Sequence, residues 1–257
     1  MRQSMNVAVI TGASSGLGRE FAVQLDAMLH RMDEIWLIAR RKERLEELSN
    51  RLQNKVRIWN MDVTDEKAME DFAQTLQKEN PAIRILVNCA GYGFMGDFSK
   101  LSLKDQLGML DVNCTALTRM TYICLPYMKK NSRIIELASS AAFLPQPGFA
   151  VYAATKAYVL SFSRALSEEL LERKIYVTAV CPGPVDTEFF DIAERYGKTL
   201  AVKKLTMVSA DRVVRDALKA SVKKQPVSVC SFWIKAFGVC SHLMPHSCIL
   251  KLMRLVK

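Results

Sequence analysis

A glycine-rich turn near the start of the chain constrains its fold more than any other feature. Residues 7–10 are apolar, the turn reads Thr11-Gly12-Ala-Ser-Ser-Gly16-Leu-Gly18, and an amphipathic helical pattern follows. Glycines permit a tight turn and a close approach of the backbone to a ligand. A strand, such a turn and a helix together present backbone N–H groups at the helix N-terminus, where a pyrophosphate binds. Taken alone, the glycines also fit a plain strand-to-helix turn.

A serine, a tyrosine and a lysine further along the chain have the spacing of a proton-transfer site. Ser139 ends an apolar run, and Tyr152 and Lys156 are placed to share one face of a helix. A phenol has a pKa of about 10, and a neighbouring ammonium lowers it. A serine hydroxyl can hydrogen-bond the same reacting oxygen. This set can move a proton on or off an alcohol while another group moves a hydride. An ordinary tyrosine on an amphipathic helix is the alternative interpretation.

Several motifs in the same order and spacing make the chain resemble the short-chain dehydrogenase/reductase family over roughly residues 5–230. The family's motif T-G-x-x-x-G-x-G is met by Thr11, Gly12, Gly16 and Gly18, and its N-N-A-G by Asn88-Cys89-Ala90-Gly91. Its catalytic asparagine matches Asn113, and its serine matches Ser139 rather than Ser140. Pro182-Gly183-Pro-Val185-Asp-Thr187 matches the segment that lines the nicotinamide. Cysteine at position 89 departs from the family's pattern.

The pattern of apolar runs predicts an α/β fold with a doubly wound parallel sheet. Further strands are expected at 35–38, 56–59, 83–87, 134–138 and 175–180, and helices at 41–53, 65–79, 103–130 and 152–172. Continuous apolar strands indicate a sheet covered on both faces. The resemblance implies a Rossmann-type order of 3-2-1-4-5-6-7, with residues 227–230 as the seventh strand. We expect one catalytic domain at 1–230 and an apolar, basic extension at 231–257 packed on it.

The resemblance also implies the chemistry and the cofactor site. Tyr152 would exchange a proton with the substrate oxygen, Ser139 would hydrogen-bond that oxygen, and Lys156 would lower the tyrosine pKa and hold the nicotinamide ribose. Asn113 would support a water in the proton relay. The cofactor-binding residues that the resemblance implies, besides Tyr152 and Lys156, are Gly12, Ser14, Ser15, Gly16, Leu17, Gly18, Arg40, Asp62, Val63, Asn88, Ala90, Gly91, Pro182, Gly183, Val185 and Thr187.

The end of the second predicted strand favours NADP(H) over NAD(H). An NAD site holds the ribose 2′-hydroxyl with an acidic residue there, whereas a 2′-phosphate needs cations. Ala39 stands at that position and Arg40 follows it. Arg40 is the better placed of two arginines, and Arg41 is expected only to start the next helix. A solvated helix start remains the alternative for both.

Apolar and aromatic residues gather in the loops expected near the nicotinamide. They are Phe94, Met95, Phe98, Phe143, Leu144, Phe149, Phe189 and Phe190. They predict a pocket for a bulky ketone or alcohol of the hydroxysteroid, bile-acid or acyl type. Residues 188–207 are expected to form a lid over it. Inside the run 134–138, Glu136 is an unexpected carboxylate that needs a partner.

The formal net charge of +10 is concentrated in the last quarter of the chain. Residues 198–257 hold 12 Lys and Arg against 2 Asp and Glu, and the rest is balanced. No nucleic-acid-binding motif accompanies this charge, so nucleic acid is not an expected partner. The apolar tail at 227–256 could pack on the body or at a subunit interface, shield the pocket, or make weak contact with an anionic membrane. His242 and His246 flank Pro245, which argues against a metal site.

The seven cysteines lack metal-ligand spacing, and the first apolar run leads directly into the glycine turn. We therefore expect a cytoplasmic protein, with membrane-peripheral attachment as an alternative. The resemblance implies a homodimer or homotetramer through 103–130 and 152–172, whose outer faces would include Ala153, Ala157 and Ala165. An NADP(H)-dependent oxidoreductase is the favoured function. A non-catalytic nucleotide-sensing or scaffold protein on the same fold is the alternative.

Overall fold

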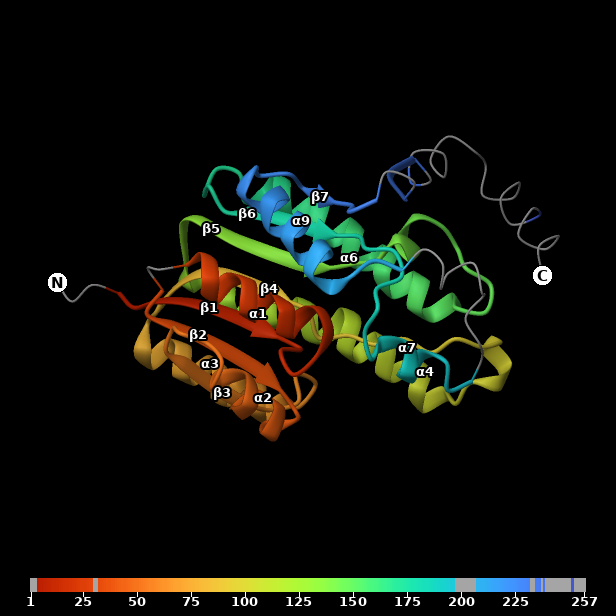
Figure 1. Ribbon diagram of the computed structural model, residues 1–257, viewed down its shortest axis with the longest axis horizontal. Helices are drawn as coiled ribbons and strands as arrows, with labels where there is room; N and C mark the ends of the chain where they lie inside the picture. The colour runs from red at the N-terminus through yellow and green to blue at the C-terminus, as the bar shows by residue number, and fades with distance from the viewer. Residues whose placement is uncertain are drawn as a thin grey trace.

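The computed structural model describes residues 4–29, 32–196, 207–231, 234–236, 238 and 251. Within them, one seven-stranded parallel sheet carries helices on both faces, which confirms the predicted fold class (Figure 1). The strands are β1 (Asn6–Thr11), β2 (Glu34–Ala39), β3 (Val56–Asn60), β4 (Ala82–Asn88), β5 (Met128–Leu137), β6 (Tyr176–Val180) and β7 (Val227–Ser228). Residues 7–10 are fully buried, as expected of a central strand covered on both sides.

The strand order is β3-β2-β1-β4-β5-β6-β7, as the family resemblance implied. The chain builds outward from β1 to β3, returns to the other side of β1 with β4, and then continues outward to β7. Thr11 and Asn88 are paired where β1 and β4 end. Because the order reverses between these two strands, their loops diverge and leave a crevice for a ligand.

Two helical layers cover the sheet. On one face lie α1 (Gly16–Met28), α2 (Lys42–Ser49) and α9 (Ala210–Val222), and on the other lie α3 (Glu66–Glu79), α5 (Leu117–Cys124) and α6 (Ala150–Glu169). Phe21 and Leu25 of α1 share a face and are buried against the sheet, as helical spacing requires. Two further helices, α4 (Leu103–Leu110) and α7 (Phe189–Ala193), lie toward the carboxyl ends of the strands (Figure 1).

The helix predicted over 103–130 is interrupted and too long. After α4, Asp111–Ala116 forms a π-helical segment before α5 begins. Leu125–Tyr127 is a 3-10 turn, and β5 starts at Met128. Pro126 lies in that turn and lacks the N–H that would continue the helix. Single π-helical turns inside helices are frequent at functional sites, and this one contains Asn113.

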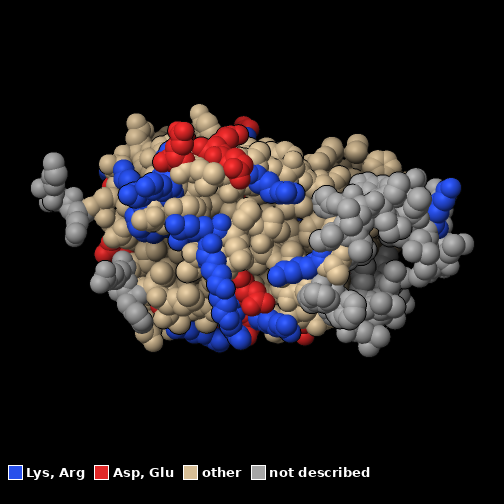
Figure 2. Space-filling view, turned by 90° about the horizontal axis from the view of Figure 1, so that it is seen from above, with Lys and Arg blue, Asp and Glu red and all other residues tan. Residues whose placement is uncertain are grey.

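The described part of the basic C-terminal quarter is mainly α9. Its Arg212, Arg215 and Lys219 are exposed, while Val213 and Val214 are buried against the sheet. Figure 2, which looks onto the upper side of Figure 1, shows Lys and Arg side chains in a band with acidic side chains beside it. Of the extension, Ile234 packs against Gly183 and Gly238 packs against Phe143. Most of the predicted apolar tail beyond residue 231, including His242 and His246, lies outside the described residues.

Candidate active site

A cavity of about 1870 Å³ opens at the carboxyl ends of the strands. It extends from the glycine turn and the end of β2, across the ends of β4 and β5, to the start of α6 and the loop after β6. Nearly all of the predicted site residues line it, although their roles remain predictions. The two that do not, Asn88 and Asn113, are buried beneath its wall. The structure therefore brings together residues separated by more than a hundred positions in the sequence.

The glycine turn has the shape that a pyrophosphate requires. Gly12 adopts φ +68°, and a Cβ there would lie 2.8 Å from the backbone nitrogen of Ala90. The Thr11 hydroxyl accepts hydrogen bonds from the Cys89 and Ala90 amides and so ties β1 to the loop after β4. Helix α1 begins at Gly16 with no acidic residue in its first turn. Its first N–H groups and positive dipole end are thus compatible with the diphosphate of a dinucleotide.

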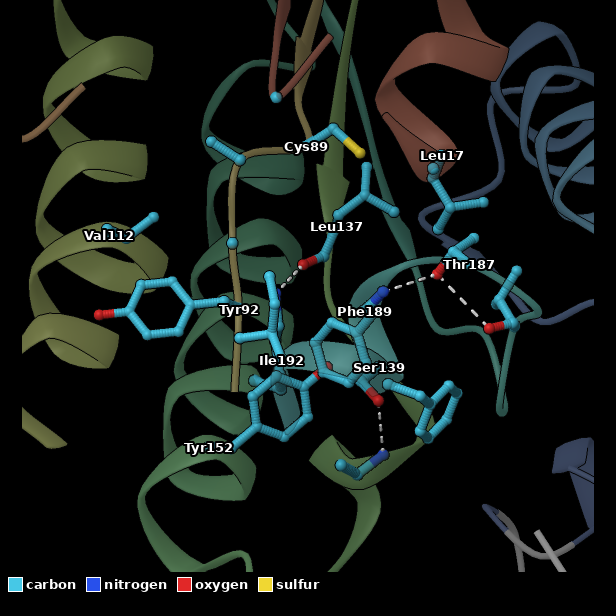
Figure 3. A pocket seen from close by; sticks show the side chains of 18 of the residues that line it. Leu17, Cys89, Tyr92, Val112, Leu137, Ser139, Tyr152, Thr187, Phe189 and Ile192 are labelled. Atoms are coloured by element: carbon cyan, nitrogen blue, oxygen red, sulfur yellow. Dashed lines mark hydrogen bonds between the residues drawn. The ribbon is translucent and has the colours of Figure 1, made fainter. Parts of the chain in front are cut away.

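Tyr152 and Ser139 meet at the other end of the cavity (Figure 3). The Tyr152 ring is stacked on Phe149 at 4.2 Å and lies 5.5 Å from the Phe189 ring. Ser139 holds its own hydroxyl in place by accepting a hydrogen bond from the Ala141 amide at 3.1 Å. Burial raises the pKa of Tyr152 to about 12, against the hydrogen bond from Ser139, which lowers it. The phenol is therefore protonated across the neutral range.

Lys156 lies one helical turn beyond Tyr152 and is buried. Its Nζ donates a hydrogen bond to the Leu137 carbonyl at 2.6 Å and is 5.7 Å from the centre of the Tyr152 ring. Burial lowers the pKa of Lys156 to about 8. Desolvation raises the pKa of Tyr152 and Ser139 lowers it, and Lys156 is not among these influences, so the lowering of the tyrosine pKa by Lys156 stays a prediction.

Asn113 organises the loop that follows β4. Its side chain accepts from the Tyr92 amide at 3.1 Å, donates to the Tyr92 carbonyl at 2.9 Å and donates to the Thr155 hydroxyl at 3.0 Å. A Cβ on Gly91 would lie 2.9 Å from Asn113 Oδ1 and 3.4 Å from Lys156 Nζ. Asn113 and Lys156 thus converge on Gly91. The role of Asn113 in supporting a water stays a prediction.

The contacts of the two arginines after β2 reverse the order in which the sequence analysis ranked them. Arg41 donates to the Ser14 hydroxyl at 3.1 and 3.2 Å and to the Ser15 hydroxyl at 2.6 Å. Arg40 has a side chain 72% exposed and lies 3.4 Å from Asp62. Arg41, expected only to start a helix, is therefore the arginine that lies on the glycine turn. No feature of the sequence separates the two arginines, because the direction in which each side chain leaves the backbone depends on where β2 ends.

These features have counterparts among known proteins. Residues 6–196 match the family model of the short chain dehydrogenases. The chain belongs to this family. It is 35% identical over 190 residues to the NADP-dependent 3-hydroxy acid dehydrogenase YdfG of Shigella flexneri, covering 72% of this chain and 75% of that protein. As a short-chain dehydrogenase, it is an NAD(P)-dependent oxidoreductase of the class that acts on CH–OH groups.

Solved structures resemble the short-chain dehydrogenase over nearly its whole length. A short-chain dehydrogenase from Sphingobium yanoikuyae in complex with NADPH is 29% identical with a TM-score of 0.76, and the match covers 93% of this chain and 95% of that one. The bulky-bulky ketone specific alcohol dehydrogenase of Comamonas testosteroni is 25% identical with a TM-score of 0.73, covering 94% of both chains.

Glu136 has partners that the sequence could not identify. In this short-chain dehydrogenase its Oε1 accepts hydrogen bonds from Asn88 Nδ2 at 3.1 Å and from the Thr121 hydroxyl at 2.9 Å. Burial raises the pKa of Glu136 to about 7. The carboxyl group lies between β4, β5 and α5 and does not line the cavity. Glu136 therefore has the partners that a buried carboxyl group requires and links the ends of β4 and β5 to α5.

The end of the cavity around Tyr152 is apolar. Of the predicted aromatic set, Phe94, Met95, Leu144, Phe149, Phe189 and Phe190 line it, together with Ile192 and Ile234. Phe98 and Phe143 do not line it, and Phe98 is 64% exposed. Helix α7 lies within the predicted lid at 188–207, of which residues 197–206 lie outside the described chain.

Two negative observations apply to the described residues of the short-chain dehydrogenase alone. None of their helices combines the length and the apolar character needed to cross a membrane. None of their His, Cys, Asp and Glu side chains form a group of three or more that could hold a metal ion.

Proposed function

We propose that this short-chain dehydrogenase interconverts a secondary alcohol and a ketone on a bulky, apolar substrate, using NADP(H). The observation that carries the proposal is the juxtaposition of Tyr152 and Ser139 at the apolar end of the cavity, with Lys156 behind them. The diphosphate-compatible glycine turn lies at the opposite end of the same cavity. When bound, the nicotinamide cofactor would donate or accept the hydride.

The protein's own residues would handle the proton. In ketone reduction, Tyr152 donates its hydroxyl proton to the substrate oxygen, and in alcohol oxidation it takes the proton back. Ser139 holds the same oxygen through a hydrogen bond. Lys156, whose pKa is lowered to about 8, is cationic at neutral pH and stabilises negative charge as Tyr152 loses its proton. Asn113 keeps the Tyr92 loop and Gly91 in position beside Lys156.

The proposed substrate class follows from the lining of the cavity. Aromatic rings from the β4 loop, the segment before α6 and α7 form its wall, and a hydroxysteroid, a bile acid or a long acyl ketone fits such a surface. The relative from Comamonas testosteroni, described as specific for bulky-bulky ketones, supports this class. The relative from Shigella flexneri is described as a 3-hydroxy acid dehydrogenase. An acyl chain with a 3-hydroxyl group therefore also belongs to the proposed substrate class.

We expect NADP(H) to be preferred, with Arg41 as the larger determinant. Arg41→Ala should raise the dissociation constant of NADPH by about 10- to 100-fold and that of NADH by less than about threefold, because a charge-assisted hydrogen bond contributes about 1.5–3 kcal/mol. Arg40→Ala should weaken NADPH binding by a smaller factor, since the Arg40 side chain is highly exposed. Fluorescence titration of both cofactors measures this. Equal losses of affinity for NADPH and NADH would show that the arginines support the structure and do not select the cofactor.

We also propose a homodimer or homotetramer. Leu103, Leu107 and Leu110 are exposed on one face of α4, and Tyr122 of α5 is 78% exposed. Ala153 was expected on this outer surface but is buried, because it faces the cavity-side cluster with Phe149 and Tyr152.

Light scattering at micromolar concentration should therefore give a multiple of the monomer mass. Leu103→Asp/Leu107→Asp should shift the protein to the monomer, whereas Val222→Asp, at a residue exposed on α9, should not. A monomeric wild type would refute this assembly.

A further inference from the structure

Glu188 lies at the cofactor end of the cavity, directly before α7, and joins the loop after β6 to α2. Its carboxylate accepts a hydrogen bond from Arg41 Nη1 at 2.9 Å and a second from Arg44. These hydrogen bonds lower the pKa of Glu188, so the group is an anion at neutral pH. Glu188 lines the cavity and its side chain is 45% exposed.

Arg41 is shared between Glu188 and the glycine turn. Its Nε and Nη2 donate to the Ser14 and Ser15 hydroxyls, while its Nη1 donates to Glu188. A guanidinium offers five donors in a fixed fork, so one side chain can serve both partners at once. The Glu188 carboxylate is therefore hydrogen-bonded to the same guanidinium that contacts the glycine turn.

A phosphate group beside Ser14 and Ser15 would need the same cation. A phosphate dianion and a carboxylate on one guanidinium repel each other, and each forms stronger hydrogen bonds when it does not share the donor. NADP(H) carries a 2′-phosphate, whereas NAD(H) carries a hydroxyl at that position. Competition from Glu188 should therefore affect NADP(H) and leave NAD(H) nearly unchanged.

We propose that Glu188 is a specificity-determining residue whose carboxylate competes with the 2′-phosphate of NADP(H) for Arg41 and so limits the preference for NADP(H) over NAD(H). This inference rests on the proposed NADP(H)-dependent function. It assigns to the segment between β6 and α7 a second role besides lining the nicotinamide and substrate ends of the cavity.

The test is a titration of NADPH and NADH against the full-length protein and four variants. Glu188→Gln should tighten NADPH binding by about 3- to 10-fold and change NADH binding by less than about twofold, because exposed ion pairs make modest contributions. Asp191→Asn is the matched control: it removes one negative charge from exposed α7 and should change either constant by less than about twofold. Arg41→Ala and Arg41→Ala/Glu188→Gln complete a double-mutant cycle.

In the Arg41→Ala background, most of the gain from Glu188→Gln should disappear, and in the wild-type background the gain should shrink as salt is raised. The inference fails if Arg41→Ala lowers the preference for NADPH over NADH, as expected, but Glu188→Gln leaves the ratio of the two dissociation constants unchanged or weakens NADPH binding. In that case the proposed NADP(H) preference stands without it. If Arg41→Ala leaves the ratio unchanged, both the assignment of Arg41 and the competition are wrong.

Discussion

Tyr152→Phe is expected to lower kcat by about 10²- to 10⁴-fold, the usual contribution of a general acid–base group. The change removes one hydroxyl and keeps the ring between Phe149 and Phe189, so packing around the site should be preserved. The dissociation constant of NADPH should change by less than about threefold, because the hydroxyl is proposed to serve the substrate oxygen rather than the dinucleotide. Steady-state kinetics and a cofactor titration measure the two effects separately.

The matched control is Tyr158→Phe on the same helix. The Tyr158 hydroxyl is bonded to the Thr118 hydroxyl at 2.7 Å, and the residue is 42% exposed and outside the cavity. Removing this hydroxyl should leave kcat within about twofold of the wild type. A Tyr152→Phe protein that is folded and retains more than about a tenth of kcat would exclude Tyr152 as the proton donor.

Gly12→Ala should destabilise the protein by about 2–4 kcal/mol, combining a left-handed backbone penalty with a forced displacement of neighbouring backbone. At φ +68°, any side chain is strained, and the new Cβ would lie 2.8 and 2.9 Å from backbone atoms of Ala90. These atoms cannot move without breaking the hydrogen bond from the Ala90 amide to Thr11. Cofactor affinity should fall as well, since Gly12 and the displaced backbone of Ala90 both line the cavity.

Gly148→Ala separates the two contributions. Gly148 has a similar φ of +76°, but a Cβ there would meet nothing within 4 Å. Its loss in free energy of unfolding should be about 1–2 kcal/mol, the penalty that backbone strain alone predicts. Denaturant unfolding of both variants compares them directly. Equal losses would show that the contact with Ala90 contributes no destabilisation.

The sequence predicted the strands and the layers because their signals are local. Apolar runs, a glycine turn and helical patterns each occupy a few neighbouring residues, and the family resemblance supplied the order in which they pair. The boundary at 103–130 was wrong because the π-helical segment at Asp111–Ala116 keeps a helical pattern in the sequence. The end of that helix is set by a turn that contains Pro126 and by the pairing of β5 with its neighbours.

The site was predictable in its membership and less so in its contacts. Tyr152, Lys156 and the glycines are recognisable because several motifs occur together in the order and spacing of one family. The choice between Arg40 and Arg41 depends on where β2 ends and in which direction each side chain leaves the backbone, and composition does not determine either. Glu136 depends on Asn88 and Thr121, which reach it only when β4, β5 and α5 are packed together.

The most direct test of NADP(H)-dependent carbonyl chemistry at Tyr152 follows nicotinamide absorbance with a panel of ketones and secondary alcohols. The panel should range from small aliphatic compounds to steroid, bile-acid and 3-keto acyl compounds, each assayed with both cofactors and with Tyr152→Phe as the control. We predict turnover of bulky apolar members, a higher kcat/KM with NADPH than with NADH, and at least a tenfold loss in Tyr152→Phe, the lower limit set above. Turnover confined to small polar carbonyls, a preference for NADH, or equal rates in the Tyr152→Phe protein would contradict the proposed function.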